Sequence, residues 1–556
     1  MKKFLAIVLA LAIMLGLCAC TGGMNVADQD KYGDDGRVQI SIGMSPNAKV
    51  TDYNDNALTK WLEEQTGCKI TFVDYSGGSD VATQISSTIA AGMALPDMLW
   101  GVSIDHSTIA TYGKEGYFVD MKEYFDDKTG ASKNFWDRME NDLTPAQQEY
   151  VLTRLINKDT GGIYSIPTIE TSLVDQVDSM AYINVQWLDK LGLKKPTNTQ
   201  ELYDVLVAFR DRDPNGNQLA DEIPLYGSQK GGTGALVLNW LINMFIYYND
   251  AHTWQDYNGD GQLELVYVQD EFREALKFIN KLYNEKLLTT MVYTASSTEM
   301  SKIISPTNDV PLCGIFLGHL TAHIRTNSPL LYQYESLKTW GCATEGDIAF
   351  SIRGFITETA EKRGVVDECF KMFMTMWSWD GSMRLRYGEK GYNWTDADEG
   401  AKSVYGLDAT FKLIVDPFSE QSNKQWGNAW CSLNYYAESE TAQAAETMTQ
   451  WAKDKATLMA SARKDFDASA AENNPKFLKD PVLLYFSMTS KEDSATSMVR
   501  VNVNSLCTST IKDFVTGSNK KDINNDADWQ AFLNKAKELG YDQYQAIYQK
   551  CWERQR

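Results

Sequence analysis

The chain has 556 residues, of which 43% are hydrophobic, and its formal net charge is −21 at pH 7. This length exceeds what a single hydrophobic core usually organises, so the composition predicts a globular protein of two or more lobes. The acidic balance excludes a general affinity for nucleic acid and for anionic lipid headgroups.

The first residues have the pattern of a secretory signal. Two lysines precede an apolar run over residues 4–17, which is too short to span a bilayer. The small Ala19 then precedes Cys20, which resembles the bacterial lipobox, whose cysteine receives diacylglycerol. We expect residues 1–19 to be removed and Cys20 to hold the protein, by lipid, at the outer face of the cytoplasmic membrane. A plain cleaved signal is the alternative.

A polar and glycine-rich segment follows over residues 20–37, and it has no apolar periodicity. Such a composition is typical of a flexible tether. We therefore predict that none of this segment folds.

The next hundred residues alternate between two hydrophobic periods. Apolar residues alternate as in strands and recur as in helices, over 38–44 (strand), 58–67 (helix), 70–73 (strand), 85–90 (helix) and 95–100 (short strand). This alternation predicts an α/β fold with parallel strands and crossover helices. In such folds ligands bind at the carboxyl ends of the strands.

Oxygen donors are concentrated between residues 211 and 222, where hard carboxylate and amide oxygens suit Ca²⁺. One register of an EF-hand loop begins at Asp211, with Gly216 at the turn and Glu222 as the last ligand. A second register begins at Asp213 and would use Asp213, Asn215, Asn217, the Leu219 carbonyl, Asp221 and Glu222. A solvated acidic turn is the alternative to a calcium site.

A second acidic loop, residues 256–264, has a similar beginning. Its twelfth position would be Tyr267, which cannot supply the bidentate carboxylate of a calcium loop. We therefore predict a turn that leads into a strand over residues 263–268.

Several segments resemble family 1 extracellular solute-binding proteins, the lipoproteins of ABC sugar importers. The resemblance is carried by Tyr164-Ser-Ile-Pro167, Trp187-Leu-Asp-Lys-Leu-Gly192, Pro196-Thr-Asn-Thr199 and the segment 387–394. The second register of the acidic loop also resembles the calcium loop of this family's alginate- and oligosaccharide-binding members, with Gln218 where the family usually has glycine. The resemblance implies a two-lobe periplasmic-binding-protein-like fold with a hinge, an interlobe cleft and a structural Ca²⁺.

The resemblance also implies how the chain divides between the lobes. Lobe 1 would comprise residues 38–165 and 348–425, and lobe 2 would comprise residues 168–347, with the calcium loop, and 426–556. Helices ending the chain are predicted over 529–539 and 544–552.

Aromatic residues make up 12% of the chain, and sugar rings pack their C–H faces on aromatic rings. We predict four tryptophans at strand or loop ends as ligand-binding residues: Trp100, Trp240, Trp426 and Trp430. The alternative is that each ring belongs to a core. In the family's topology His319 and Arg353 follow strands that reach the cleft; Arg353 would clamp an acidic sugar or pair with a structural carboxylate.

Seven cysteines lie beyond the signal, an odd number without CxxC or other paired spacing. This pattern argues against a disulfide framework and predicts buried thiols. The four histidines also lack the spacing of a zinc site.

No nucleophile elbow, phosphate loop or metalloprotease helix is present in the sequence. We therefore expect a monomer that captures an oligosaccharide without chemistry. The family resemblance implies that it delivers the ligand to a two-subunit permease driven by a cytoplasmic ATPase. Two alternatives are a lipid-anchored glycoside hydrolase, which would use two carboxylates, and a calcium-dependent adhesin.

Overall fold

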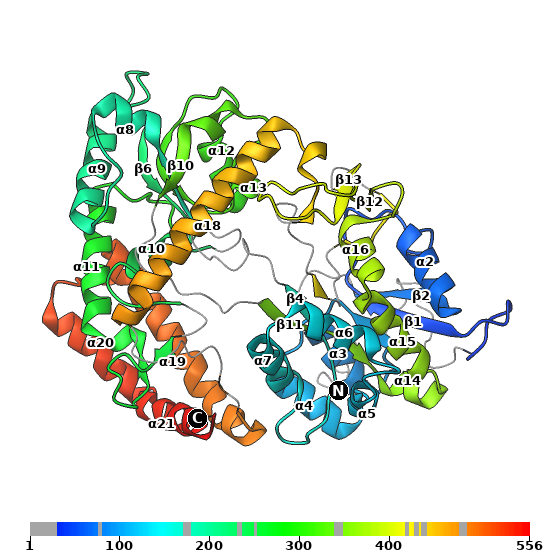
Figure 1. The fold of residues 1–556 in the computed structure, drawn as a ribbon. Coiled ribbons are helices and arrows are strands. Elements are labelled where there is room, and N and C mark those ends of the chain that lie inside the picture. Colours follow the sequence, from blue (N-terminus) through cyan, green and yellow to red (C-terminus); the bar gives the residue numbers. More distant parts are fainter. Residues whose placement is uncertain are drawn as a thin grey trace, which may run out of the picture. The chain divides into compact units, whose positions relative to one another are not determined.

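The computed structural model describes residues 30–75, 81–170, 180–230, 236–249, 253–337, 349–416, 422–427, 433–434, 442–477, 486 and 488–555. The chain divides into two compact units (Figure 1). Unit 1 comprises Met1–Ile169, Phe350–Thr395 and Ile414–Asn434, and unit 2 comprises Glu170–Ala349, Asp396–Leu413 and Tyr435–Arg556. The chain therefore passes from one unit to the other several times.

Unit 1 is built on a sheet in the order β14-β4-β11-β3-β1-β2. Its strands are β1 (Gln39–Met44), β2 (Lys69–Asp74), β3 (Met98–Trp100), β4 (Ile166–Glu170), β11 (Ala349–Ile356) and β14 (Leu433–Asn434). Strand β1 pairs in parallel with β2 and β3, whereas β11 pairs antiparallel with β3. The predicted parallel start of the fold is confirmed.

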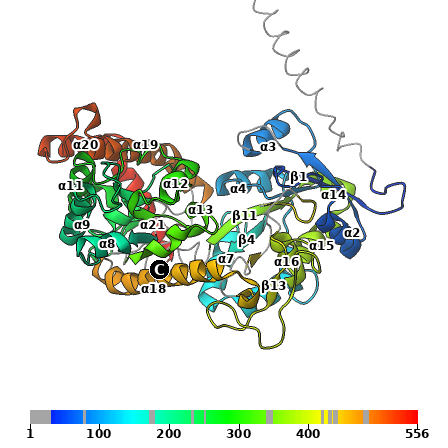
Figure 2. The same ribbon diagram turned by 90° about the horizontal axis from the view of Figure 1, so that it is seen from above.

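One helix of unit 1, α2 (Ala57–Thr66), begins and ends at residues that cap it. The Asn56 side chain accepts a hydrogen bond from the Leu58 backbone N–H, and Gly67 ends the same helix at φ 76°, a conformation that favours glycine. The helices are α2 (Ala57–Thr66), α3 (Val81–Ala90), α4 (His106–Glu115), α5 (Lys122–Asp126), α6 (Lys133–Asp142), α7 (Pro145–Leu155), α14 (Glu358–Arg363), α15 (Val366–Trp377) and α16 (Trp379–Tyr387). Helices α14, α15 and α16 follow one another beside the sheet (Figures 1 and 2).

Unit 2 is built on a sheet in the order β10-β5-β9-β6. Its strands are β5 (Ala181–Asn184), β6 (Ile223–Tyr226), β9 (Cys313–Leu317) and β10 (Tyr334–Leu337). Strands β6 and β9 are parallel, and β5 is antiparallel to both of its neighbours. Every residue of β5 and β9 is buried, so both faces of this sheet are covered.

The helices of unit 2 enclose a large apolar core that includes α11 and the last helices of the chain. They are α8 (Val185–Leu191), α9 (Thr199–Asp211), α10 (Val237–Ile242), α11 (Asp270–Asn284), α12 (Ser297–Ile304), α13 (Leu320–His323), α18 (Gln450–Phe477), α19 (Ser490–Thr516), α20 (Asp526–Glu538) and α21 (Tyr541–Gln555). Helix α18 contacts β10, and α19 contacts α11, α20 and α21. No described helix combines the length and the apolar character that crossing a bilayer requires.

Short elements complete the description. They are the pairs β7 (Trp254–Gln255) with β8 (Glu264–Leu265) and β12 (Trp394–Asp396) with β13 (Phe411–Leu413), and the 3₁₀ turns Val266–Val268, Pro329–Gln333, Ala445–Thr447 and Ser518–Lys520. Residues 256–263 form the turn of the antiparallel β7–β8 hairpin, so the predicted turn is confirmed. The strand that follows is only two residues long, because the backbone turns into a 3₁₀ helix at Val266.

The N-terminal segment departs from our prediction of a wholly flexible tether, because residues 30–37 lie against unit 1. Tyr32 forms a β-bridge with Val38, and the Lys31 ammonium donates to the Gly364 carbonyl at 2.6 Å. These contacts could not be predicted from the polar composition of the segment, because main-chain groups and charged side chains make them and no apolar pattern marks them.

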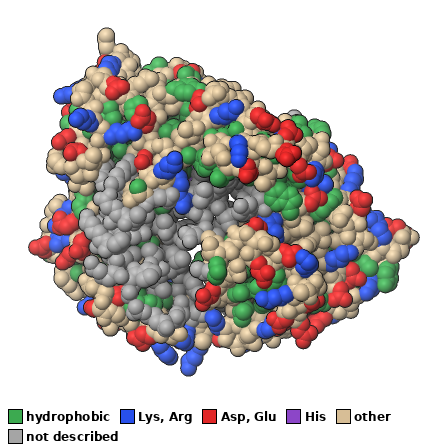
Figure 3. Space-filling view, viewed as in Figure 1, with side chains coloured by type: hydrophobic (Ala, Val, Ile, Leu, Met, Phe, Trp, Pro, Cys, Tyr) green, Lys and Arg blue, Asp and Glu red, His purple; other side chains and the backbone are tan. Residues whose placement is uncertain are grey.

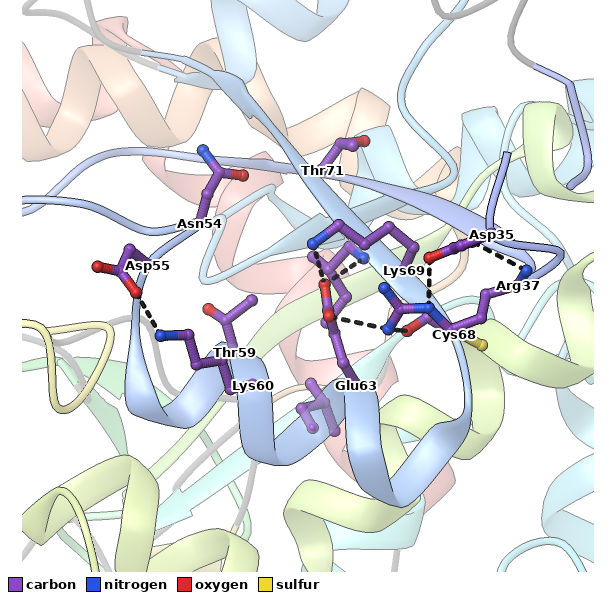
Figure 4. A network of polar contacts seen from close by, with 12 residues as sticks. Asp35, Arg37, Asn54, Asp55, Thr59, Lys60, Glu63, Cys68, Lys69 and Thr71 are labelled. Carbon is purple, nitrogen blue, oxygen red and sulfur yellow. Dashed lines mark hydrogen bonds and ion pairs between the residues drawn. The ribbon is translucent and has the colours of Figure 1, made fainter. Parts of the chain in front are cut away.

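Glu63 of α2 is the centre of the ion-pair network that holds the end of this segment (Figure 4). Its carboxylate pairs with Arg37 and with Lys69, each at 3.0 Å, and accepts a hydrogen bond from the Ile70 N–H, also at 3.0 Å. Burial alone raises the pKa of Glu63, but these three contacts outweigh it and leave the pKa below its ordinary value. Glu63 therefore joins the N-terminal segment, α2 and β2 as a charged group.

The two units also differ from the predicted lobes between residues 396 and 434. Residues 396–413 belong to unit 2, and Trp426, which we placed in lobe 2, belongs to unit 1. Its indole N–H donates to the Thr59 hydroxyl of α2 at 2.8 Å. No local pattern in the sequence records this long-range contact.

The described cysteines are buried free thiols, as predicted: Cys68, Cys313, Cys369, Cys507 and Cys551. Burial raises the pKa of Cys507 to about 12 and that of Cys551 to about 11, so both remain protonated and unreactive at neutral pH. Cys342 and Cys431 lie outside the described residues.

Candidate functional site

The predicted calcium loop connects α9, which ends at Asp211, to β6, which begins at Ile223. Its backbone turns sharply, with positive φ at Asp213 (45°), Gly216 (77°) and Gln218 (63°). A side chain at Gln218 is strained in this left-handed region, where glycine is the usual residue. Gln218 is also the position at which the second register expects glycine.

The side chains of the loop favour the second register. The Asp211 carboxylate is bound by the guanidinium of its neighbour Arg210, through contacts of 2.7 and 2.9 Å. The Asp213 carboxylate instead accepts from the N–H groups of Gly216 at 2.9 Å and Gln218 at 3.2 Å. The Asp213 carboxylate therefore lies inside the turn, where the first calcium ligand of the second register is expected. The Asp211 carboxylate lies outside the turn and is bound to Arg210.

The other predicted ligands gather around Asp221. Its Oδ1 accepts from the side-chain amides of Asn215 at 3.0 Å and Asn217 at 3.1 Å. Glu222 carries a buried Oε1 that has no hydrogen-bond partner in the described structure. Burial raises the pKa of Glu222, and the nearby carboxylates of Asp221 and Asp213 raise it further.

This donor set suits a hard cation in its chemistry. Among the described residues no three His, Cys, Asp or Glu side chains converge as a metal cluster. In the loop, the amides of Asn215 and Asn217 lie beside the Asp221 carboxylate. The side-chain N–H groups of both amides now bond Asp221, and rotating the amides by half a turn would direct their oxygens there, with loss of the backbone N–H bonds that those oxygens accept. A cation would then offset the charge of Asp221 and would satisfy the Glu222 oxygen that lacks a partner in the described structure.

A lysine holds the loop from outside. The Lys190 ammonium of α8 donates to the carbonyls of Pro214 at 2.9 Å and Asp213 at 3.3 Å. Lys190 belongs to the Trp-Leu-Asp-Lys-Leu-Gly segment that carried the family resemblance, so this segment and the loop are one local structure.

The two predicted polar residues each lie beside the carboxyl end of a strand. His319 follows β9 and is the N-cap residue of α13, with a half-buried side chain. Arg353 lies in β11, where its carbonyl accepts from the Val102 N–H just beyond β3 and its Nε donates to the Ser351 hydroxyl at 3.3 Å. Both side chains are therefore placed where α/β proteins bind ligands.

The described tryptophans among the predicted ligand residues are almost fully buried. Trp100, Trp240 and Trp426 expose 0%, 1% and 0% of their surface. Trp100 stacks on Phe373 with ring centroids 4.6 Å apart, and Trp426 meets Trp100 edge-on at 5.3 Å. Their burial supports the alternative that these rings stabilise the cores, and their contact with a ligand stays a prediction. Trp430 and Cys20 lie outside the described residues.

Two residues of unit 1 were not identified from the sequence, Tyr53 on the loop between β1 and α2 and Asp74 at the end of β2. The Tyr53 ring is half-buried there, and Asp74 ends the neighbouring β2 with an exposed side chain. The parallel pairing of β1 and β2 places both at the carboxyl edge of the sheet. Both residues follow or end a predicted strand, and this position could have identified them as candidate ligand-binding residues. No sequence motif marks them.

Comparison with known proteins gives three findings. Residues 47–312 match the family described as bacterial extracellular solute-binding protein. The fructooligosaccharide ABC transporter substrate-binding protein FusA of Streptococcus pneumoniae serotype 4 (strain ATCC BAA-334 / TIGR4) is 30% identical over 302 residues, which cover 52% of this chain and 53% of that protein. The chain thus spans about half the length of the curated relatives it matches.

Solved structures extend the likeness of the fold to nearly the whole chain. The structure of S. pneumoniae FusA in complex with kestose has a TM-score of 0.68 at 20% identity and covers 93% of this chain and 99% of that chain. The alginate-binding protein AlgQ2 without calcium ion has a TM-score of 0.61 at 18% identity and covers 95% and 99%. The predicted α/β fold is confirmed.

Proposed function

Because residues 47–312 match the family described as bacterial extracellular solute-binding protein, we propose that this chain belongs to that family and captures an oligosaccharide for an ABC transporter. The observation that carries the proposal is this family match, supported by the 30% identity to a fructooligosaccharide-binding transporter component. The relatives named above are binding proteins rather than enzymes, and we propose that this chain likewise leaves its ligand unchanged.

The ligand site of each unit would lie at the carboxyl edge of its parallel strands. His319 supplies an imidazole at the end of β9, and Arg353 supplies a guanidinium beside β3. Both groups can form hydrogen bonds with sugar hydroxyls, and this role needs no catalytic group beside them. Of the residues predicted from sequence, these two are already accessible in part, so we propose them before the buried tryptophans.

For the loop after α9 we propose a structural Ca²⁺. Asp213, Asn215, Asn217, Asp221 and Glu222 would hold it, together with the Leu219 carbonyl. When bound, the ion supplies positive charge that neutralises the carboxylates of the loop. The residues themselves tie the end of α9 to the start of β6 and hence to the sheet of unit 2.

We further propose that Cys20 carries the lipid anchor and that the protein acts as a monomer at the outer face of the cytoplasmic membrane. The permease subunits of the transporter would receive the ligand there. The relative LipO of Bacillus subtilis (strain 168), 25% identical over 295 residues, is described as a lipoprotein and supports this placement.

Binding to purified protein that begins at residue 21 tests the function. We expect isothermal titration calorimetry with fructooligosaccharides to give a micromolar Kd, which corresponds to about −8 kcal/mol. Chromatography of the recovered sugar should show unchanged chain length. A shortened sugar would replace this proposal with the glycoside hydrolase, and failure to bind any oligosaccharide would favour the adhesin.

A further inference from the structure

A continuous series of aromatic rings runs through unit 1 from its core to its surface. Neighbouring ring centroids are separated by 4.6 to 5.4 Å along the order Phe373, Trp100, Trp426, Phe72 and Tyr53. The first three rings are buried, whereas Phe72 and Tyr53 are only half-buried. Tyr53 is therefore the accessible end of a rigid apolar support.

The backbone fixes Tyr53 from several directions. Its hydroxyl accepts from the Asn47 N–H at 2.8 Å, and its carbonyl accepts from the Thr59 hydroxyl at 2.6 Å. The preceding residues are held by Asn423, whose Oδ1 accepts from the N–H groups of Thr51 at 3.1 Å and Asp52 at 2.8 Å. A ring held in this way loses little conformational entropy when a ligand packs on it.

The Tyr53 hydroxyl retains hydrogen-bonding capacity. It accepts one bond from the Asn47 backbone, and no described residue accepts its proton. A ligand oxygen can therefore receive that proton while the ring remains in place.

A carboxylate adjoins this ring. Asp74 ends β2 at the same sheet edge, on the same face of the strand as Phe72. Burial is the main cause that raises the pKa of Tyr53; the hydrogen bond from the Asn47 N–H opposes it, and the negative charge of Asp74 adds to it.

We propose that Tyr53 and Asp74 form a subsite of unit 1 for one uncharged sugar residue, an inference that rests on the proposed function. The C–H face of the sugar packs on the Tyr53 ring, and its hydroxyls donate to the Asp74 carboxylate. A uronic acid at this place would bring a second carboxylate next to Asp74, and the repulsion would disfavour it. The subsite thus selects neutral oligosaccharides over acidic ones.

The test compares neutral trisaccharides (kestose, maltotriose and xylotriose) with trigalacturonate by isothermal titration calorimetry. We expect the parent to bind a neutral sugar, and Tyr53→Ala to weaken that binding about tenfold or more. Tyr53→Phe, which keeps the ring, should weaken it only about threefold. Asp74→Asn should weaken neutral binding and narrow the preference against trigalacturonate.

Tyr32→Ala is the matched control, because Tyr32 pairs with Val38 at the amino end of β1, in the same unit but at the opposite sheet edge. Its 59% exposed side chain should be dispensable for binding. If Tyr53→Ala fails to fold, the Tyr53→Phe and Asp74→Asn results decide the question.

The outcomes separate this inference from the proposed function. If the parent binds a neutral sugar and neither position 53 nor position 74 affects it, the subsite is wrong while oligosaccharide capture stands. If the parent prefers trigalacturonate, the proposed selection of neutral over acidic oligosaccharides is wrong. If it binds none of the four sugars, the subsite is overturned, whereas the proposed function is overturned only if no other oligosaccharide binds either.

Discussion

At the scale of single residues, Gln218 occupies a backbone conformation that its side chain opposes. Its φ of 63° lies in the left-handed region, which costs a non-glycine residue about 1–2 kcal/mol. Glycine removes that cost but adds flexibility to the unfolded chain, which offsets part of the gain. We predict that Gln218→Gly stabilises the protein by roughly 0.5–1 kcal/mol, measured by urea unfolding.

The control for this prediction is Gln262→Gly in the β7–β8 turn. Gln262 directly follows Gly261, whose φ is 83°, and does not itself have positive φ. Replacing it should therefore destabilise the protein slightly. Equal effects of the two substitutions would show that backbone strain at Gln218 is not the cause.

Glu492 provides a second prediction at this scale. Its carboxylate is bound by both nitrogens of Arg554 at 2.9 Å and closes the capping box of α19, and the side chain is 13% exposed. The Arg554 hydrogen bonds are the main cause that lowers the pKa of Glu492 to about 2. Because the pKa is lower in the folded state, this contribution is fully present above about pH 4.5 and is lost as pH falls towards 2.

The variant Glu492→Gln isolates the charge, since glutamine also completes a capping box. We expect it to reduce the free energy of unfolding by about 2 kcal/mol at pH 7. The difference from the parent should shrink below pH 4.5 and disappear near pH 2. Glu538→Gln, in an exposed pair with Lys535, should change little at any pH. A Glu492→Gln effect that does not depend on pH would contradict the assignment.

Residue chemistry was easier to predict from sequence than residue exposure. The oxygen donors of the loop were recognisable because alternate spacing brings Asp213, Asn215 and Asn217 to one side of a turn. The exposure of Trp100 depends on Phe373 and Trp426, which are more than 250 positions away in the chain. Only the tertiary structure brings such residues together, so no local pattern could report that Trp100 is buried.

At the scale of elements, helices and strands could be predicted where the sequence has capping residues or a clear apolar pattern. Helix α2 has an N-cap asparagine and a terminal glycine, and the strands β1 and β2 have buried apolar residues. Helices α18 and α19 were missed although they are 28 and 27 residues long. Alanine and lysine are frequent in α18, and serine, threonine and valine are frequent in α19, and neither sequence is strongly amphipathic. Their helical state therefore depends on packing against β10 and α11.

The link between α9 and β6 leads to a prediction about calcium. An ion bound only by the folded protein stabilises it by mass action, by about 2.7 kcal/mol at one hundred times its dissociation constant. We therefore expect EGTA to lower the Tm of the parent and to leave Asp213→Ala unaffected. Differential scanning calorimetry with and without added Ca²⁺ measures both effects.

Asp211→Ala is the matched control, because the Asp211 carboxylate is bound by Arg210 outside the turn. It should respond to EGTA like the parent. A loss of the EGTA response in Asp211→Ala would instead support the register that begins at Asp211. An unchanged Tm of the parent in EGTA would show that the loop is only a turn.

At the scale of the whole molecule, charge decides how the body meets a membrane. The chain carries 74 acidic and 53 basic residues, and on the face drawn in Figure 3 both kinds are interspersed. A chain with a net charge of −21 gains no electrostatic attraction to anionic lipids, and removal of Lys2 and Lys3 with the expected signal makes it more acidic. Electrostatic attraction therefore does not account for membrane attachment of the processed protein, and we propose that covalent lipid does.

Cys20 is the residue on which the proposed attachment depends. Two acyl chains suffice for stable anchoring, whereas an acidic body gains no electrostatic attraction to an anionic surface. We predict that Cys20→Ala moves the protein from the membrane fraction to the medium, as measured by fractionation and immunoblotting of intact cells. Cys18→Ala, which lies before the cleavage position, should remain in the membrane fraction. Retention of Cys20→Ala at the parent's level would contradict the lipid anchor and would require a second attachment to the membrane or to the permease.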